Sequence, residues 1–484
     1  MQSFISALNK HTYFDKKKFA SSVFFLFIIY FLAIIGIIRA NFNYVDDIRR
    51  SVEGNSLTGD FSRHISTFLS YFLHTDSHLT DISPLPQLVA CLFLSLTGII
   101  LVKVICNKTD KFLLIATLPI GLTPYFLSCL SYKFDAPYMA LSILASVLPF
   151  LFMQKNRGLF AFVCIASTLV MTMTYQASSG IFIMMLLFIF FTNLLYKKET
   201  LKNNFIFLGI AFGSYCIALL MFKLFFLANV NTYVSHDLVK LENMIAVFLR
   251  NIQRYFIVEF SYVNIKWKIL SIAIIAIFYI KTIVLSKVNK IVSFFLTSIF
   301  LLLLGTSIFG IYLLLENPLF SPRAMYAVGF FLAILGVDIA FSLKKIFSLP
   351  SILLIWCFFV FSFAYGNALA DQKRYNEFRT QLLISDLSAL LPERTDEPYS
   401  LAILNYMDYS PVVENVAVNH PMVKHIVKQY LREECPFTYI YLSDYHKFNL
   451  CRGEEKFDKT MPVVFESYYH SIRMIDKKIV VILK

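Results

Sequence analysis

The chain has 484 residues, of which 58% are hydrophobic and only 15% charged, and its formal net charge is +13. Soluble proteins average roughly 25% charged residues, so this composition is typical of a membrane protein. Basic loops beside anionic lipid explain the positive charge, which is therefore no sign of nucleic-acid binding. The sequence contains no Walker loop, dinucleotide fingerprint or zinc-type cysteine spacing, so a nucleotide-driven reaction is not indicated.

The first apolar run, 19–38, is long enough to span a bilayer. Arg39 and Asn41 follow it in place of a small-residue cleavage pattern, so we expect a retained anchor rather than a signal peptide. Ten further apolar runs lie at 85–105, 112–130, 138–153, 159–173, 180–195, 205–228, 269–285, 291–315, 324–342 and 351–369. We therefore predict a polytopic all-α membrane protein with about eleven transmembrane helices. Two adjacent runs, 138–153 and 159–173, are short for a span, so tilted neighbours or a re-entrant pair are alternatives.

The distribution of Lys and Arg predicts the orientation of the chain. These residues are dense near the N-terminus and in the short connections of the same side, such as 154–158 and 196–204, and sparse on the opposite side. The positive-inside rule then places the N-terminus in the cytoplasm. With an odd number of spans, the C-terminal tail lies outside. We expect a transmembrane domain over 1–369 and an outside domain over 370–484.

The first outside loop contains an amphipathic segment, "DFSRHISTFLSYFLH" at 60–74. Its aromatic and aliphatic residues recur at helical spacing, with serines on the other side. This pattern is typical of a helix lying in the membrane interface, and packing against other loops is an equal alternative. His64, His74 and His78 lie in the same loop, but their spacing favours surface imidazoles over metal ligands.

The tail has the composition of a small α/β domain. We predict helices at 382–391 and 420–434 and strands at 400–405 and 437–442. Its cysteines, Cys435 and Cys451, are the two that lie clear of apolar runs, and either a disulfide or two free thiols is compatible with the sequence. Four tyrosines can stack on a glycan or fill the domain core: Tyr406, Tyr409, Tyr439 and Tyr441.

The stretch "NYVDDIRR", 43–50, places four charges just after the first span. Capping of a helix start uses one carboxylate, so Asp46 and Asp47 are not both explained by it. Carboxylates can also take a proton from a hydroxyl, and the guanidinium groups of Arg49 and Arg50 can hold a phosphate. The octet therefore suits transfer from a phosphate-linked donor.

Further polar residues converge on the same predicted outer edge. In "SYKFDAPYMA", Lys133 and Asp135 precede a span, although a salt-bridged turn with a helix cap is an equal alternative. In "TYQASSG", Tyr175 and Gln176 are of sugar-binding types that are also common at membrane interfaces. Glu259 and Arg323 lie near this edge as well.

Three of these segments, "NYVDDIRR", "SYKFDAPYMALSILASVLPF" and "TYQASSGIF", resemble the serotype-converting O-antigen glucosyltransferases of Gram-negative bacteria and their temperate phages. The similarity covers about 20–370 and is weaker in the tail. The resemblance implies an inner-membrane enzyme of the GT-C type, which transfers glucose from undecaprenyl-phosphate glucose to O-antigen in the periplasm. It also implies that a first-loop aspartate acts as general base.

Asp46 and Asp47 occupy the position of that base. We expect Arg49, Arg50, Lys133 or Arg323 to bind the donor phosphate, and Asp135, Tyr175, Gln176 and Glu259 to bind substrate. The tail would position the acceptor glycan. No cofactor is expected, and a need for a divalent metal is left open.

Two alternatives belong to other classes. A flippase for lipid-linked saccharides would need charged residues deep in the bundle, which are scarce apart from such positions as Lys223 and Asp338. An O-antigen polymerase or ligase would share the outside site but not the first-loop motif.

Overall fold

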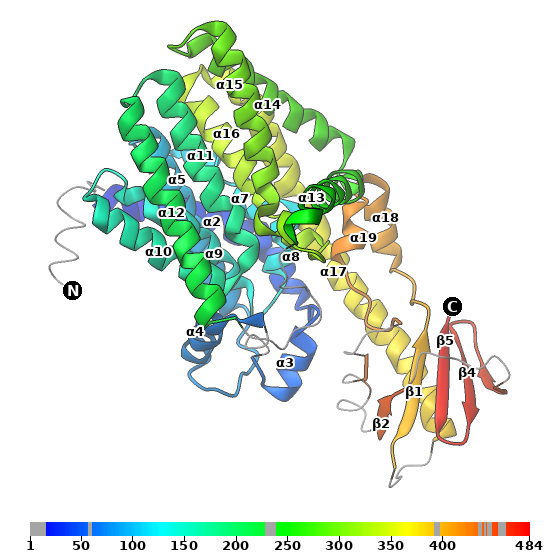
Figure 1. Ribbon diagram of the computed structural model, residues 1–484. Helices are drawn as coiled ribbons and strands as arrows, with labels where there is room; N and C mark the ends of the chain where they lie inside the picture. Colours follow the sequence, from blue (N-terminus) through cyan, green and yellow to red (C-terminus); the bar gives the residue numbers. More distant parts are fainter. Residues whose placement is uncertain are drawn as a thin grey trace.

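The computed structural model describes residues 16–56, 61–227, 239–391, 397–433, 438–439, 442, 448–453 and 461–484. They form a bundle of helices with a small sheet beyond one end (Figure 1). The helices are α2 (Lys16–Ala40), α3 (Asp47–Glu53), α4 (His64–His74), α5 (Leu85–Cys106), α6 (Lys111–Ile115), α7 (Pro119–Leu122), α8 (Pro124–Leu130), α9 (Ala136–Val147), α10 (Arg157–Thr174), α11 (Ser179–Tyr196), α12 (Leu201–Phe225), α13 (Met244–Gln253), α14 (Ile265–Leu285), α15 (Lys290–Thr306), α16 (Ala327–Ser342), α17 (Leu349–Leu390), α18 (Pro411–Asn419) and α19 (Met422–Ile426). The strands are β1 (Tyr399–Leu404), β2 (Leu450–Arg452), β3 (Val463–Glu466), β4 (His470–Ile475) and β5 (Lys478–Leu483).

The predicted polytopic helical class is confirmed. Within the described residues, eight helices are long and apolar enough to cross a membrane. A ninth candidate, Lys111–Leu122 with Pro124–Leu130, is bent by 69° where Thr123 adopts an extended conformation ahead of Pro124. Two shorter apolar helices, Ala136–Phe152 and Ala327–Ser342, lie among them. The eight long helices would become the expected eleven crossings if the bent pair and the two shorter helices each crossed the membrane once.

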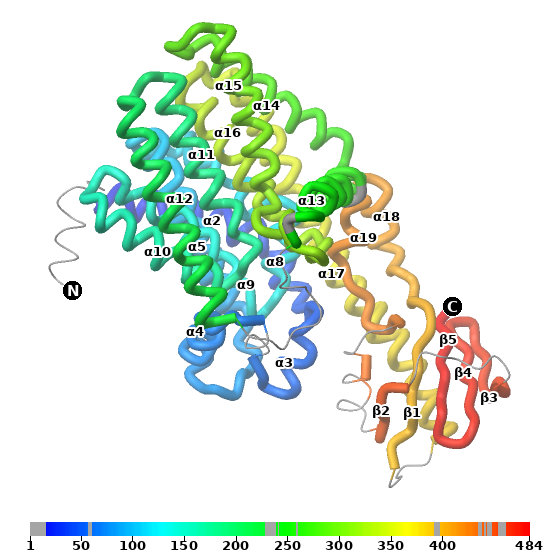
Figure 2. Tube along the Cα trace, in the orientation of Figure 1, coloured from blue at the N-terminus to red at the C-terminus, as the bar shows by residue number. Residues whose placement is uncertain are grey.

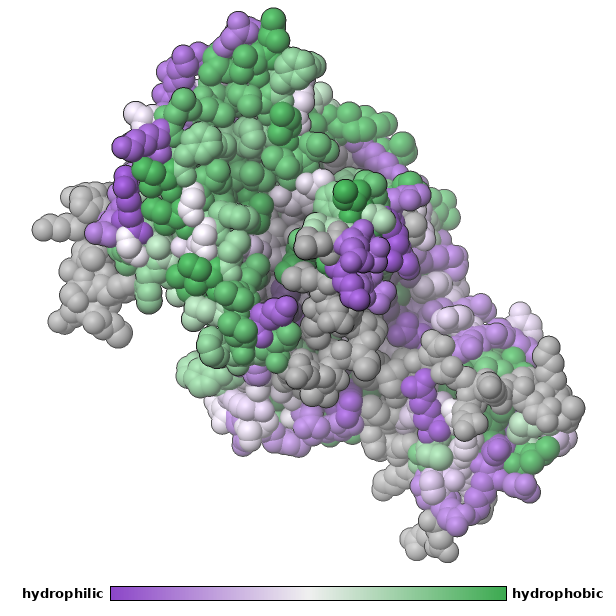
Figure 3. Space-filling model, viewed as in Figure 1, coloured by the Kyte–Doolittle hydropathy of each residue, from purple (hydrophilic) through white to green (hydrophobic). Residues whose placement is uncertain are grey.

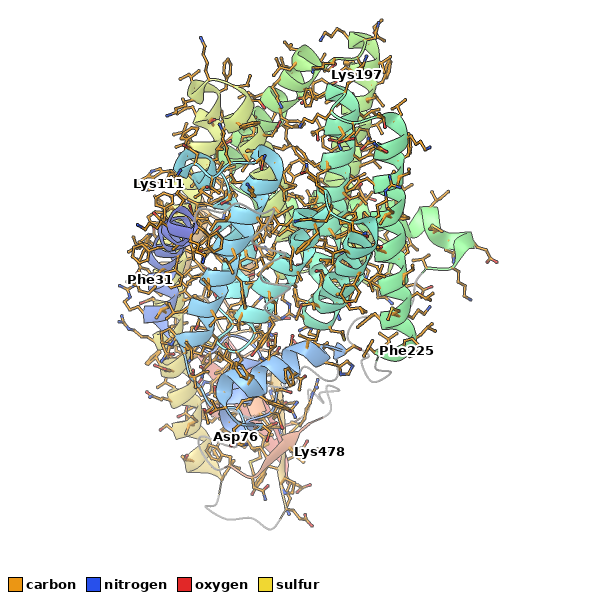
Figure 4. The ribbon with its side chains drawn as sticks, turned by 90° about the vertical axis from the view of Figure 1, so that its left-hand side faces the viewer. Phe31, Asp76, Lys111, Lys197, Phe225 and Lys478 are labelled. Carbon is orange, nitrogen blue, oxygen red and sulfur yellow. The ribbon has the colours of Figure 1, made fainter. Side chains whose placement is uncertain are left out.

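The surface of the bundle is that of a membrane-embedded protein. Figure 3 shows a broad hydrophobic face over α12, α14 and α15, bordered by hydrophilic residues toward both ends. Figure 4 shows Lys111 and Lys197 toward one end and Asp76, Phe225 and Lys478 toward the other. The first loop and the tail therefore share one end, as predicted.

Capping residues explain where several helices begin at the Lys197 end. The side chain of Asn156 accepts from Gly158 N at 2.7 Å before α10, and that of Asn289 accepts from Ile291 N at 2.9 Å before α15. Thr200 caps α12 in the same way. These side chains satisfy backbone N–H groups that have no partner inside a helix.

The first and last long helices pack closely against each other. A Cβ atom added at Gly366 of α17 would lie only 2.5 Å from the carbonyl carbon of Gly36 in α2, so this approach requires glycine. Helix α17 then continues without a break past the expected domain boundary at 369/370 and carries the tail (Figure 2). The contact sets the end of α2, and hence the first loop, beside the base of the tail.

Helix α4 buries its polar face against the protein and exposes its apolar face, the reverse of a surface helix in a soluble protein. Ser66, Ser70 and His74 are buried against the protein, and the Ser66 hydroxyl donates to Thr174 O at 3.2 Å. Phe68 and Phe72 are 71% and 77% exposed. An outward apolar face is what an interfacial helix requires, so the structure favours the membrane-interface interpretation over packing on loops.

The tail contains a five-stranded sheet in the order β2-β1-β5-β4-β3. Strand β1 pairs in parallel with β2 and β5, and β3, β4 and β5 are antiparallel. The last turns of α17 cover it through Leu383 and Leu387, which cluster with Leu401 and Val481. The predicted α/β character and the strand at 400–405 are confirmed.

Two predicted elements of the tail are wrong. The helix expected over 420–434 ends at Ile426, because 431–433 pair instead with 405–407 through Met407 N to Leu431 O (3.2 Å) and Glu433 N to Asn405 O (2.8 Å). Of the strand expected over 437–442, the described residues are helical. Tertiary pairing has overridden local sequence preference in the first case.

The fold leads to a prediction about topology. A reporter that is active only in the periplasm should be active when fused after Lys484 and inactive when fused after Asn203, because these positions lie at opposite ends of the bundle and Lys and Arg concentrate around the second. A fusion after Phe225 serves as the control and should behave like the one at Lys484. The reverse pattern would place the first loop and the tail in the cytoplasm.

Candidate active site

The first loop reverses direction immediately after α2. Asn41 and Val45 adopt positive φ angles of 44° and 51°, which turn the chain into α3. Asp46 is at the N-cap position of α3, yet its side chain makes no capping hydrogen bond and is half-buried. The capping explanation considered for the aspartates therefore does not apply to Asp46.

Asp47 is completely buried and joins two loops. Its Oδ2 atom accepts hydrogen bonds from Tyr44 N in the first loop and from Lys133 N in the turn between α8 and α9, each at 3.0 Å. Its Oδ1 atom has no hydrogen-bond partner. Burial raises the pKa of Asp47 from 3.8 to about 7, although both N–H donors and the charges of Arg50 and Lys133 oppose this rise.

The neighbouring cations are engaged with carboxylates. Arg50 is buried and donates to Asp135 Oδ1 at 2.6 Å. Lys133 Nζ donates to Asp81 Oδ2 at 2.8 Å and to Asn43 Oδ1 at 2.7 Å. The salt-bridged turn considered for Lys133 and Asp135 thus exists, with partners from the first loop.

Arg49 differs from Arg50, although the two are adjacent. It is exposed and pairs with Glu53 at 2.7 Å, one helical turn further along α3. A pair of this kind contributes little to stability. Neither Arg49 nor Arg50 is among the residues that line the cavities described below.

A small cavity of about 150 Å³ lies beside the first-loop turn. Its lining combines the first loop, the end of α8, the 321–323 turn and the tail, and consists of Tyr44, Val45, Ser128, Tyr132, Ser321, Pro322, Arg323, His425, Ile426, Lys428 and Arg432. Arg323 donates to the Tyr132 hydroxyl. The carboxylate of Asp46 is close enough to act electrostatically on Tyr132 and on Arg50. Val45, the residue directly before Asp46, lines this cavity, whose lining includes the cations Arg323, Lys428 and Arg432.

A larger cavity of about 420 Å³ adjoins the first and shares Arg323 with it. Its walls are mostly apolar, with Leu219, Leu220, Phe222, Leu227, Ile311, Leu315 and Leu319 among its lining residues. Three cations, Arg63, Lys223 and Arg323, line it together with Gln176. Arg63 is 4.6 Å from the ring centroid of Tyr175 and 5.0 Å from that of Phe61, which holds the guanidinium group in place.

The structure brings together some of the predicted residues and not others. Arg323 and Gln176 line the cavities directly, and Tyr175 is buried beneath Arg63 and stacked on Tyr326. The side chain of Glu259 lies outside the described residues.

Five lining residues were not among the site residues predicted from the sequence: Arg63, Lys223, His425, Lys428 and Arg432. Lys223 carried one usable signal, because a charge near the end of an apolar span is a functional candidate.

No group of three or more His, Cys, Asp or Glu residues suited to a metal ion occurs in the described part of the chain. His64 and His78 are exposed, as predicted. His74 is not a surface imidazole: it is buried and stacks on Phe134 with ring centroids 5.5 Å apart. Cys451 is exposed in β2, whereas Cys435 lies outside the described residues, so their pairing stays a prediction.

Residues 36–334 match the model of the glucosyl transferase GtrII family. The chain belongs to this family. The matched region runs from within α2 to within α16, so it includes both aspartates of the first loop, Arg63, Lys223 and Arg323, and it ends before the tail. The resemblance inferred from the three outer-edge segments is confirmed, and family membership makes the chain a glycosyltransferase.

One relative extends over most of the chain. It is an uncharacterized 55.3 kDa protein encoded in the region 5′ of gtrB in Salmonella phage P22, 21% identical over 407 residues, which cover 81% of this chain and 83% of the relative. No solved structure matches the chain.

The buried carboxylate of Asp47 leads to a prediction about stability and pH. Between about pH 4 and pH 7 the folded chain keeps a proton on Asp47 that the unfolded chain has lost, so the free energy of unfolding should fall as the pH rises through this window and level off above it. Asp47→Asn should remove this contribution to the slope while retaining an acceptor for both N–H groups. Thermal unfolding of the purified protein at pH 5 and pH 8 measures the difference.

Asp47→Ala provides the comparison. It leaves Tyr44 N and Lys133 N without their acceptor, and each unsatisfied donor costs about 1–3 kcal/mol. It should therefore unfold at a clearly lower temperature than Asp47→Asn. Equal stability of the two variants, or an unchanged pH slope in Asp47→Asn, would contradict the assigned role of this carboxylate.

Proposed function

We propose that this glucosyltransferase moves a glucosyl residue from undecaprenyl-phosphate glucose to a sugar of the O-antigen at the periplasmic face of the bacterial inner membrane, and thereby converts the serotype. The observation that carries the proposal is the pair of adjoining cavities at the first-loop end of the bundle. One is apolar with three cations, and the other is polar and lined by Val45, the residue directly before Asp46.

The larger cavity has the chemistry that a lipid-linked phosphate donor requires. Its leucine- and phenylalanine-rich wall suits a prenyl chain, and Arg63, Lys223 and Arg323 can neutralise a phosphate. This assignment replaces Arg50 and Lys133 as the principal phosphate ligands, because those two cations are engaged with Asp135 and Asp81. Arg323 keeps the role expected from the sequence.

We assign the general base to Asp46 and a positioning role to Asp47. Asp47 has no exposed surface, so it cannot meet an acceptor hydroxyl. Asp46 directly follows Val45, which lines the smaller cavity, and makes no capping hydrogen bond that would occupy its carboxylate. The buried bonds of Asp47 fix the turn from which Asp46 projects.

The proposed transfer needs no nucleotide, since the sugar is already activated by its bond to phosphate. The acceptor hydroxyl oxygen attacks C1 of the glucosyl group, and its proton passes to the Asp46 carboxylate. The bond between C1 and the phosphate oxygen breaks, and the electron pair leaves with the carrier phosphate. The three cations stabilise the charge that develops on this phosphate in the transition state.

The tail contributes to the site more directly than the sequence suggested. We expected it to lie apart from the chemistry, but His425, Lys428 and Arg432 line the smaller cavity. We propose that this segment binds the acceptor glycan. Among the tyrosines considered for stacking, Tyr406 is 59% exposed, whereas Tyr409 and Tyr439 donate to backbone carbonyls within the tail, and Tyr441 lies outside the described residues.

The proposed function also implies a fold class and an orientation in the membrane. We propose a GT-C type enzyme with eleven crossings, in which the bent pair and the two shorter helices each count as one. The N-terminus is cytoplasmic and the tail, 370–484, forms a periplasmic domain. In this proposal Asp135 and Tyr175 have positioning roles in place of direct substrate binding. Asp135 holds Arg50 through their ion pair, and Tyr175 supports the guanidinium group of Arg63.

The function is tested with purified protein, undecaprenyl-phosphate [¹⁴C]glucose and a lipid-linked O-antigen repeat. We expect label in the acceptor and release of undecaprenyl phosphate in equal amounts. Labelling from UDP-glucose alone, or movement of the donor between leaflets without transfer, would overturn the proposal.

The two aspartates should differ in kinetics. Asp46→Asn should lower kcat by about 10²–10⁴-fold because it removes the proton acceptor, while the donor KM stays nearly unchanged. Asp47→Asn should retain most of the activity at pH 8, since it preserves the hydrogen bonds of the turn. If Asp46→Asn is active and Asp47→Asn is not, the assignment is reversed.

Substitution of the cations that line the larger cavity should weaken binding of the donor. Arg63→Gln and Lys223→Gln should each raise the donor KM about tenfold or more, the loss expected of one hydrogen bond to a charged group. Lys266→Gln removes an exposed cation that lines neither cavity and serves as the control. An equal effect of all three substitutions would show a general electrostatic attraction and no dedicated phosphate site.

A further inference from the structure

A cavity of about 620 Å³ lies at the end of the bundle opposite to the candidate active site. It is formed by the end of α5, the segment before α10, the beginnings of α10 and α12, and the end of α11. Lys197, next to the lining residue Lys198, marks this end in Figure 4. The proposed transfer reaction uses none of its residues, so the cavity needs a separate explanation.

The rim of this cavity carries an excess of cations. Lys155, Arg157 and Lys198 line it together with one carboxylate, that of Glu199. Among the residues that the structure describes, no carboxylate lies within 4.0 Å of the three cations. The rim is therefore suited to an anion.

Two helix N-termini reinforce this preference. Arg157 is the first residue of α10, an 18-residue helix, and Asn203 lies in the first turn of α12, a 25-residue helix. Both line the cavity. The positive ends of these two helices add to the charge of the side chains and favour a phosphate group.

The floor of the cavity is apolar. Phe160, Phe188 and Ile189 are buried there, and Phe207 and Ile210 line its α12 side. A free inorganic anion gains nothing from such a floor. A lipid gains from both parts, because its phosphate meets the cations while its acyl chain covers the aromatic and aliphatic side chains.

A second cavity of about 220 Å³ continues from the first and shares Ile105, Phe188, Thr192 and Lys198 with it. At its far side Lys281 forms a buried ion pair with Asp338. This pair neutralises Lys281, so the anion should contact the rim cations and not the deeper lysine. The position of the anion is thereby limited to the outer part of the cavity.

We propose that this cavity binds one anionic phospholipid from the leaflet at the Lys197 end, with its phosphate among Lys155, Arg157 and Lys198 and an acyl chain along Phe160 and Phe207. The site is distinct from the proposed donor cavity. It holds a phosphate lipid at the opposite face of the same protein, and it does not depend on the proposed reaction.

Native mass spectrometry of the full chain in detergent tests the proposal. Phosphatidylglycerol should bind with one saturable site of higher affinity than phosphatidylethanolamine. Arg157→Gln/Lys198→Gln should weaken this site about 25-fold, since each basic residue near an anionic lipid contributes roughly fivefold. Inorganic phosphate up to millimolar concentration should not displace the lipid.

Lys287→Gln/Lys344→Gln is the matched control, because it removes two exposed cations from the same end that do not line the cavity. It should leave the site unchanged, and thermal unfolding should show both double variants to be folded. Equal affinity for the two lipids, or an equal loss in the control, would overturn the site. Displacement by inorganic phosphate would overturn the assignment of a lipid and show that the cavity binds an anion only.

Discussion

The buried carboxylate of Asp47 is the constraint on which the site depends. Its Oδ2 atom accepts one hydrogen bond from the first loop and one from the turn between α8 and α9, so the two loops cannot move independently. The buried Arg50–Asp135 pair ties the same two segments together a second time. Removing one member of such a pair leaves an uncompensated buried charge, which typically costs about 3–5 kcal/mol. The network thus holds Asp46 and Val45 in one orientation beside the cavities.

Both ends of the chain contribute to the smaller cavity, the first loop through Tyr44 and Val45 and the tail through His425, Lys428 and Arg432. Helix α2 leads into the first loop, α17 leads into the tail, and the close contact at Gly36 and Gly366 places both exits side by side. Tyr44 then donates to Ile426 O in the tail at 2.6 Å. The family match ends before α17, so the part of the cavity that the tail supplies lies outside the region shared across the family. A polar segment of this kind is well placed to distinguish one acceptor glycan from another.

The sequence predicted the features that depend on local composition. Long apolar runs predicted the helices, and the charges of "NYVDDIRR" indicated a candidate site just after the first of them. Features that depend on distant contacts could not be predicted. Whether Arg50 meets a phosphate or a carboxylate depends on Asp135, 85 residues away. Arg63 belongs to the amphipathic segment 60–74, and only the structure shows that it packs over Tyr175 and lines the larger cavity. The helix expected over 420–434 failed for the same reason, because 431–433 pair with another segment of the tail.

A cryo-electron microscopy structure of the protein with a non-transferable phosphonate analogue of the proposed polyprenyl-phosphate glucose donor tests the proposed donor site most directly. We expect density for the prenyl chain against Leu219, Phe222 and Leu315. The phosphonate should contact Arg63, Lys223 and Arg323, and the glucosyl C1 should face Asp46. A phosphonate bound to Arg50 and Lys133, with their bonds to Asp135 and Asp81 broken, would contradict the proposed site.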